Sequence, residues 1–222
     1  MKRHFVVNLL SFNAGFVDTA GFLGLQGLFT AHVTGNFVTL GYALVFGTHG
    51  VTAKLIALPE FVVVVALARL IGTSLRAAKL PDLKILLGVK VVLLFAFFAV
   101  AVRSGPFPDS DSPAALLTGL AGIAAMAVQN AVHRVHFAAL PPTTLMTGNT
   151  TQATLDVVDL LSGVAGDQTA AIRLRLFRTL AGIVAFAAGC GAAAILYAWV
   201  GFWCLGVPVV VGAVSAVVHI KD

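Results

Sequence analysis

Charged side chains are scarce in this chain. Asp, Glu, Lys and Arg make up 10% of the 222 residues, whereas soluble domains carry about 25%. Hydrophobic residues make up 59%, and the mean hydropathy is +0.99. Apolar runs of the length needed to cross a bilayer, about 20 residues, recur along the chain. The shortage of charge excludes an ordinary soluble domain and predicts a protein embedded in a lipid bilayer.

Cysteines and recognised catalytic motifs are also lacking. Cys190 and Cys204 both fall in apolar segments, where free cysteine packs as a small hydrophobic residue. The sequence contains no Walker loop, dinucleotide fingerprint, His-Glu-x-x-His pair or Gly-x-Ser-x-Gly elbow. We therefore expect no enzyme, no cofactor and no metal site. The net charge of +5 is spread over short loops, so we expect no nucleic-acid partner either.

Six apolar segments are candidate membrane spans, at residues 5–24, 57–74, 86–102, 114–132, 179–200 and 201–218. Lys2-Arg3-His4 before the first segment resembles the start of a signal peptide. Polar residues interrupt that segment, however, so we predict a retained first span. Two shorter segments, at residues 36–47 and 150–162, also have helical character. The positive-inside rule tests whether these two short helices cross the bilayer.

If neither short helix crosses and the N-terminus is cytoplasmic, twelve of the 14 basic residues lie inside, Lys221 among them, and only Lys54 and Arg103 lie outside. If both cross, only eight lie inside. The rule therefore predicts two re-entrant helices and two cytoplasmic termini. The halves 1–106 and 107–222 then have opposite orientations. We expect one all-α transmembrane domain over residues 1–222, built from two inverted repeats of three spans and one re-entrant half-helix each. Transporters and channels recurrently use this plan.

The tripeptide Thr34-Gly35-Asn36 recurs as Thr147-Gly148-Asn149, at an offset of 149 − 36 = 113 residues. A half-helix of about ten residues that starts at either motif reaches the membrane centre. We expect the threonines to cap these helices, and the glycines to let backbone approach closely. Free N–H groups at both helix starts predict a midplane site for a small polar or anionic solute. The alternative is that the motifs only cap and pack helices.

Asp18 is a carboxylate inside the first predicted span, and such a residue marks a functional site by default. Across the two halves it aligns with Asn130, next to Gln129. Asp18 is predicted to couple protons or contact solute; the alternative is a structural hydrogen-bonding role. Its expected partners are Asn13, Gln129, Asn130 and the free N–H groups at Asn36. His32 is a candidate gate or solute ligand.

Two stretches carry a family resemblance. Gly15-Phe16-Val17-Asp18-x-x-Gly21-Phe22, followed by Phe29-Thr30-Ala31-His32-Val33-Thr34-Gly35-Asn36, is similar to a signature of the YoaK family of bacterial membrane proteins. Ala127-Val128-Gln129-Asn130-Ala131, followed by the stretch from Pro142 to Gln152, resembles the family's second signature, with Val128 where glycine is more usual. The resemblance implies an inner-membrane protein of about six spans and no established activity.

The residues favour a membrane transporter or channel for a small polar or anionic solute. A non-transporting membrane scaffold or sensor is the alternative. The expected partners are the lipid bilayer and the solute, with a homodimer left open, and the expected location is the bacterial inner membrane. The candidate solute-binding residues are Asp18, His32, Thr34, Gly35, Asn36, Gln129, Asn130, Thr147, Gly148 and Asn149.

Overall fold

Helices account for all the regular secondary structure in the computed structural model, which describes residues 2–48, 50–163 and 166–218. Within those ranges there is no β-strand, so the all-α prediction is confirmed. The elements in chain order are α1 (Lys2–Gly24), α2 (Gly35–Phe46), α3 (Val51–Ala77), α4 (Asp82–Ser104), α5 (Pro113–His136), α6 (Met146–Leu161), the short 3-10 turn η1 (Gly166–Gln168), α7 (Thr169–Val200), the 3-10 turn η2 (Gly201–Leu205) and α8 (Gly206–Val217).

Five helical segments of the described chain have the length and composition to cross a membrane. They are α1 from Arg3, α3, α4, α5 and the continuous stretch Gly166–Val217, which holds both α7 and α8. The prediction of a multi-pass membrane protein is thus confirmed at this level. Helices α2 and α6, with 12 and 16 residues, are shorter than the roughly 20 residues that a span needs.

Two helices extend well beyond the predicted segments. Helix α3 begins at Val51 instead of residue 57, and α7 begins at Thr169 instead of residue 179. The added turns of α7 contain exposed basic residues such as Arg173, which an apolar window leaves out. Hydropathy locates the part of a helix that lipid can solvate, whereas the helix itself continues as long as its backbone hydrogen bonds do.

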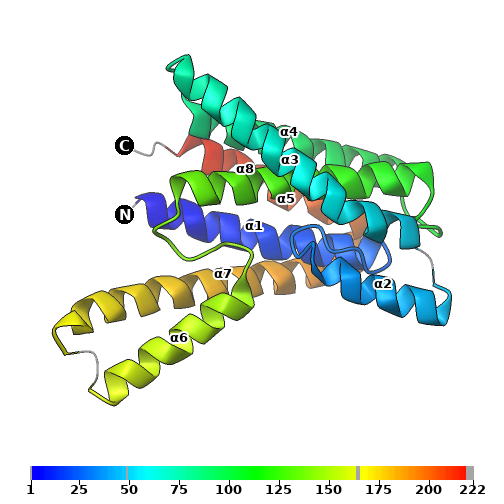
Figure 1. Cartoon of the computed structure of the whole chain (residues 1–222). Coiled ribbons are helices and arrows are strands. Elements are labelled where there is room, and N and C mark those ends of the chain that lie inside the picture. Colours follow the sequence, from blue (N-terminus) through cyan, green and yellow to red (C-terminus); the bar gives the residue numbers. More distant parts are fainter. Residues whose placement is uncertain (1, 49, 164–165, 219–222) are drawn as a thin grey trace.

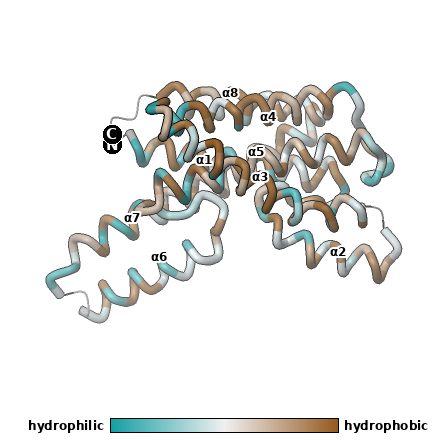
Figure 2. The backbone as a smooth tube through the Cα atoms, turned by 45° about the horizontal axis from the view of Figure 1, so that its top comes forward, coloured by the Kyte–Doolittle hydropathy of each residue, from teal (hydrophilic) through white to brown (hydrophobic). Residues whose placement is uncertain are grey.

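The long helices lie side by side, and the described ends of α1 and α8 are at the same end of the bundle (Figure 1). The link between α4 and α5 lies at the opposite end. Helix α2 starts near the middle of the bundle and runs toward that opposite end, whereas α6 starts near the middle and runs toward the end that carries the termini. Apolar residues dominate the middle of the long helices, with polar residues at the turns (Figure 2).

Helices α1 and α7 touch backbone to backbone, through one glycine from each. A Cβ atom on Gly15 would overlap the carbonyl oxygen of Phe186, and one on Gly189 would overlap that of Phe12. Small residues allow this close approach in membranes, where dispersion contacts hold helices together. The pair α1–α7 thus joins the first helix of the chain to a helix of the second half.

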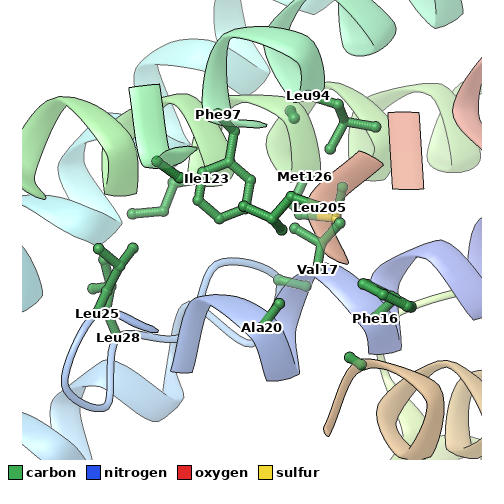
Figure 3. Packing of buried hydrophobic residues seen from close by; sticks show 14 of the residues in the cluster. Phe16, Val17, Ala20, Leu25, Leu28, Leu94, Phe97, Ile123, Met126 and Leu205 are labelled. Atoms are coloured by element: carbon green, nitrogen blue, oxygen red, sulfur yellow. The ribbon is translucent and has the colours of Figure 1, made fainter. Parts of the chain in front are cut away.

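Apolar side chains from both halves fill the centre of the bundle. Phe16 and Val17 of α1 pack with Phe97 of α4, Met126 of α5 and Leu205 of η2 (Figure 3). A second, smaller cluster lies nearer the N-terminal end of α1, and includes Val6, Val7, Leu10, Leu86, Leu87, Val128 and Val132. Interlocking of α1, α4 and α5 holds the two halves together.

Replacing Gly189 by alanine should destabilise the protein, because its methyl group would collide with the backbone of α1. Overpacking of this kind costs about 1–3 kcal/mol. The matched control is Gly191→Ala, since a Cβ atom there meets nothing within 4 Å. Unfolding of the purified variants in mixed micelles, followed by circular dichroism, should give a lower free energy for Gly189→Ala alone. Equal free energies for the two variants would contradict the close α1–α7 contact.

Candidate functional site

The loop between α1 and α2, residues 25–34, is fastened to the side of α1 by Asp18. One carboxylate oxygen, Oδ1, accepts the backbone N–H groups of Thr30 at 2.8 Å, Ala31 at 2.7 Å and His32 at 3.2 Å. Asp18 lies six residues before the end of α1, so the loop folds back about 9 Å along the helix. Backbone N–H groups at that depth need partners inside the protein, and the carboxylate supplies one for three of them.

Asn36, in the first turn of α2, closes the same loop from the other side. Its amide nitrogen donates to the carbonyl oxygen of Phe29, and its Oδ1 accepts the N–H of Phe29, both at 2.8 Å. Asn149 of α6 repeats half of this clamp, because its Nδ2 donates to the carbonyl oxygen of Pro142 at 2.8 Å. Both asparagines reach seven residues back, but Pro142 has no N–H to return the second bond.

Helix α5 holds the second loop, residues 137–145, as α1 holds the first. Gln129 Nε2 donates to the hydroxyl of Thr143 at 3.1 Å, and Asn130 Oδ1 accepts the hydroxyl of Thr144 at 2.8 Å. His133 Nε2 bonds the carbonyl oxygen of Pro141 at 3.0 Å. Asn130 lies six residues before the end of α5, which is the place that Asp18 has in α1.

A cavity of about 410 Å³ lies between the two loops. Helices α3 and α5 form its other walls, and most of its lining is apolar. The polar residues on it are His32, Thr34, Arg69, Asn130, Arg134 and Thr144. Neither arginine forms an ion pair with another described residue. Segments far apart in the sequence therefore meet at a cavity that carries two positive charges and no carboxylate in its lining.

A family model described as "Protein of unknown function (DUF1275)" matches residues 6–218. The chain belongs to this family. No curated protein and no solved structure matches it. The two motifs resemble a family without established activity, and the DUF1275 description is consistent with that resemblance. This description does not contain the name YoaK. Since the description of the DUF1275 family gives no activity, the function has to be argued from the site.

In this DUF1275 protein, the threonine caps predicted from the repeated motif are wrong. Thr34 precedes α2, but its side chain makes no capping hydrogen bond, and its backbone is already helical at φ −68° and ψ −22°. A capping side chain needs an extended backbone at this position. Thr147 lies inside α6, whose N-cap residue is Leu145. The asparagines bind the loops instead.

The partners expected for Asp18 are also corrected. The amide of Asn13 donates to the carbonyl oxygen of Pro208, and Gln129 and Asn130 bond elsewhere. Asp18 bonds the N–H groups of the loop itself, which fold back onto it after the end of α1. The donors lie 12 to 14 residues after Asp18, beyond the end of α1. Helical periodicity in the sequence therefore gives no sign of these contacts.

The cavity brings together three of the expected site residues: His32, Thr34 and Asn130. Helices α2 and α6 do not touch each other, and the buried side chains of Asn36 and Asn149 each bind their own loop. Gly148 and Asn149 border a separate hollow of about 350 Å³. Gly35 packs against the ring of Phe29, and Thr147 lies on the exposed surface of α6.

Sequence reasoning missed Arg69, Arg134 and Thr144 as residues of one cavity. A signal for Arg69 was present, because this arginine falls within the predicted span 57–74, and an ionisable residue inside a span indicates a functional site. Arg134 gave no such signal, since it lies in the last turn of α5, where basic residues commonly meet the membrane surface.

Replacing Asn36 by alanine should cost more stability than the same change at Asn149. Asn36 makes two hydrogen bonds to Phe29, whereas Asn149 makes one to Pro142 and a weak one, at 3.7 Å, to the thioether sulfur of Met146. With about 1 kcal/mol per hydrogen bond, we expect a loss near 2 kcal/mol for Asn36→Ala and near 1 kcal/mol for Asn149→Ala. Unfolding free energies of the two variants in the same micelles check the order. Equal losses, or the reverse order, would contradict the clamp geometry.

Proposed function

We propose that this protein carries a small organic anion across the bacterial inner membrane, and that the cavity between the loops binds this solute. The observation that supports the proposal is the meeting of both loops at one cavity flanked by Arg69 and Arg134. The volume of about 410 Å³ falls in the range of small-molecule sites.

The lining suits an anion that has an apolar body. A guanidinium group forms paired hydrogen bonds with a carboxylate, and these bonds are strong where water is scarce. Leu58, Phe61 and Val65 of α3 give the cavity an apolar wall. Such a wall offers nothing to the hydration shell of an inorganic ion, so a carboxylate with an apolar body fits better.

The arrangement of the helices supports two inverted repeats, residues 1–106 and 107–222. Each half has a long helix, a folded-back loop, a short helix that starts near the middle of the bundle, and then two further helices. Asp18 and Asn130 hold the loops from equivalent places, and Asn36 and Asn149 each reach seven residues back. We infer that α2 and α6 are re-entrant and that the repeats rock against each other around the cavity.

The basic residues support a cytoplasmic location for both termini. Lys79 follows the end of α3, Lys84 lies in the first turn of α4 and Arg173 in the second turn of α7. These helix ends are at the end of the bundle that carries the described ends of α1 and α8. Lys221, which also entered the charge count, lies outside the described residues. The positive-inside rule then assigns this end to the cytoplasm.

The alternative function is a membrane scaffold or sensor without transport. The hydrogen bonds of Asp18, Asn36 and Asn149 are compatible with it, because these side chains hold the loops in place without any solute. This alternative gives no reason for two arginines without ion pairs beside one cavity. We therefore favour transport.

Topology can be tested by labelling single cysteines in a background with Cys190 and Cys204 replaced by alanine. A cysteine at Asp109, which is exposed in the α4–α5 link, should react with an impermeant maleimide added to intact cells. Cysteines at Lys84 and Arg173, also exposed, should react only after the membrane is opened. Ser110 is unsuitable, because it is 1% exposed and its hydroxyl bonds Gln26. The reverse labelling pattern would place the termini outside.

Anion binding can be tested by thermal unfolding of the purified protein in detergent. Benzoate should raise the unfolding temperature in a concentration-dependent way, because ligands that bind only the folded state stabilise it. Benzamide, which has the same shape without the charge, should do so less. The variants Arg69→Gln and Arg134→Gln should lose the benzoate effect.

The matched control is Arg103→Gln, since Arg103 is exposed in the last turn of α4 and does not line the cavity. It should keep the response of the unchanged protein. If benzoate, acetate and phosphate at equal ionic strength all leave the unfolding temperature unchanged, the cavity is not an anion site, and the scaffold alternative gains support.

A further inference from the structure

Four fully buried side chains each keep a polar atom without a hydrogen-bond partner in the described part of the chain. The atoms are Ser11 Oγ and Asn13 Oδ1 of α1, Lys90 Nζ of α4 and Gln129 Oε1 of α5. Each of these residues is 0% exposed. Buried polar atoms in folded proteins are nearly always paired, so four orphaned atoms on three packed helices call for an explanation.

The four residues lie at the level where the two apolar clusters meet. In α1, the smaller cluster ends at Leu10 and the larger begins at Ala14, on either side of Ser11 and Asn13. In α4, Leu87 belongs to the smaller cluster and Leu94 to the larger, with Lys90 between them. In α5, Met126 belongs to the larger cluster and Val128 to the smaller, and Gln129 follows Val128. Ser11 lies on another side of α1, because a Cβ atom at Gly182 of α7 would lie 3.8 Å from its Oγ. We call Asn13, Lys90 and Gln129 the polar layer.

Helix α8 brings two parts of this layer together. A Cβ atom at Gly212 would lie 3.1 Å from Leu94 Cδ1, 3.4 Å from Val91 Cγ2 and 3.5 Å from Asn13 Nδ2. Asn13 therefore faces the side of α4 that carries Leu94. Lys90 lies four residues before Leu94, on the same face and one turn away.

The unpaired atoms are complementary in kind. Asn13 Nδ2 donates to the carbonyl oxygen of Pro208 at 3.2 Å, and Gln129 Nε2 donates to that of Leu10 at 2.8 Å. Both amide nitrogens are thus engaged, and both amide oxygens are left as acceptors. Lys90 offers only donors. Small molecules that both donate and accept can bridge such a set, and water does so most commonly in protein interiors.

Acidic groups do not neutralise Lys90 within the described residues. Helices α3, α5, α8 and the turn η2 pack against α4. The described part of α8 has no acidic or basic side chain, and η2 contributes only the thiol of Cys204. The remaining titratable groups are Lys54, Glu60, Arg69 and Arg76 of α3, His133, Arg134 and His136 in the last turn of α5, and Arg3, His4 and Asp18 of α1, none of which bonds Lys90.

We propose that the polar layer is an internal water-binding site in which Lys90 exchanges a proton with the bound water. The ammonium form gives its proton to water, leaving a neutral amine and a hydronium ion, and the reverse step restores it. An ammonium group inside a membrane bundle needs a counter-charge or water, and no counter-charge bonds Lys90. This site is separate from the cavity between the loops and stands whether or not that cavity binds an anion.

Reductive methylation with formaldehyde and a borane tests the proposal, because only a neutral amine reacts. The protein is embedded in lipid nanodiscs, and methylation at each lysine is followed by peptide mass spectrometry. Lys84, which is exposed, reports reagent supply. Cys204, which is 2% exposed, should stay unreactive toward a maleimide and so excludes unfolded molecules. We expect Lys90 to be methylated under these conditions.

Two substitutions in α1 provide a matched pair of variants. Asn13→Ala removes an unpaired acceptor from the polar layer and should slow the methylation of Lys90 several-fold, with Lys84 unchanged. Ser11→Ala also removes an unpaired buried hydroxyl, but this hydroxyl faces Gly182 of α7, so the rate at Lys90 should stay unchanged.

Lys90 that stays unmodified while Lys84 reacts to completion would overturn the proposal, as would equal effects of the Asn13→Ala and Ser11→Ala variants. If the Asn13→Ala variant fails to fold, methylation of Lys90 in the unchanged protein still decides.

Discussion

A backbone N–H group inside a bilayer must find a hydrogen-bond acceptor within the protein, and the structure of both halves depends on this constraint. The chain is non-helical over residues 25–34 and 137–145, where it folds back along α1 and α5. Polar side chains compensate, chiefly the carboxylate of Asp18 for the first loop and the amide and imidazole groups of α5 for the second. An unpaired carboxylate in an apolar helix would cost free energy, and the hydrogen bonds to the first loop give Asp18 a structural role.

Fixing the loops also fixes the cavity. Because Asp18 and Asn36 hold the first loop and Asn130 and Asn149 the second, their inner edges form two walls of one space beside α3 and α5. Helix α6 is fastened to α7 by the buried carboxylate of Asp156, which accepts several hydrogen bonds from the guanidinium of Arg175. The residues that build the site are therefore largely different from those that would contact a solute.

Helix α1 takes part in three features of the bundle, which are the first loop, the α1–α7 contact and the polar layer. Asp18 holds a loop, Gly15 admits the backbone of α7, and Asn13 belongs to the polar layer with Lys90. Ionisable groups buried in a membrane bundle need specific partners, and here Asp18 of α1 and Lys90 of α4 differ sharply. Asp18 is saturated by loop amides, whereas Lys90 bonds no described protein group.

The sequence by itself determined the all-α membrane class and the two short helices, because hydropathy is a local property. It also identified Asp18, Asn36 and Asn149 as special, without their partners. Only the tertiary structure decided that Asn36 and Asn149 bind their own loops, that Asp18 bonds residues 30–32, and that Arg69, Arg134 and Thr144 share a cavity. Those outcomes depend on how far each loop folds back and on which face of each helix meets its neighbour, and long-range packing sets both.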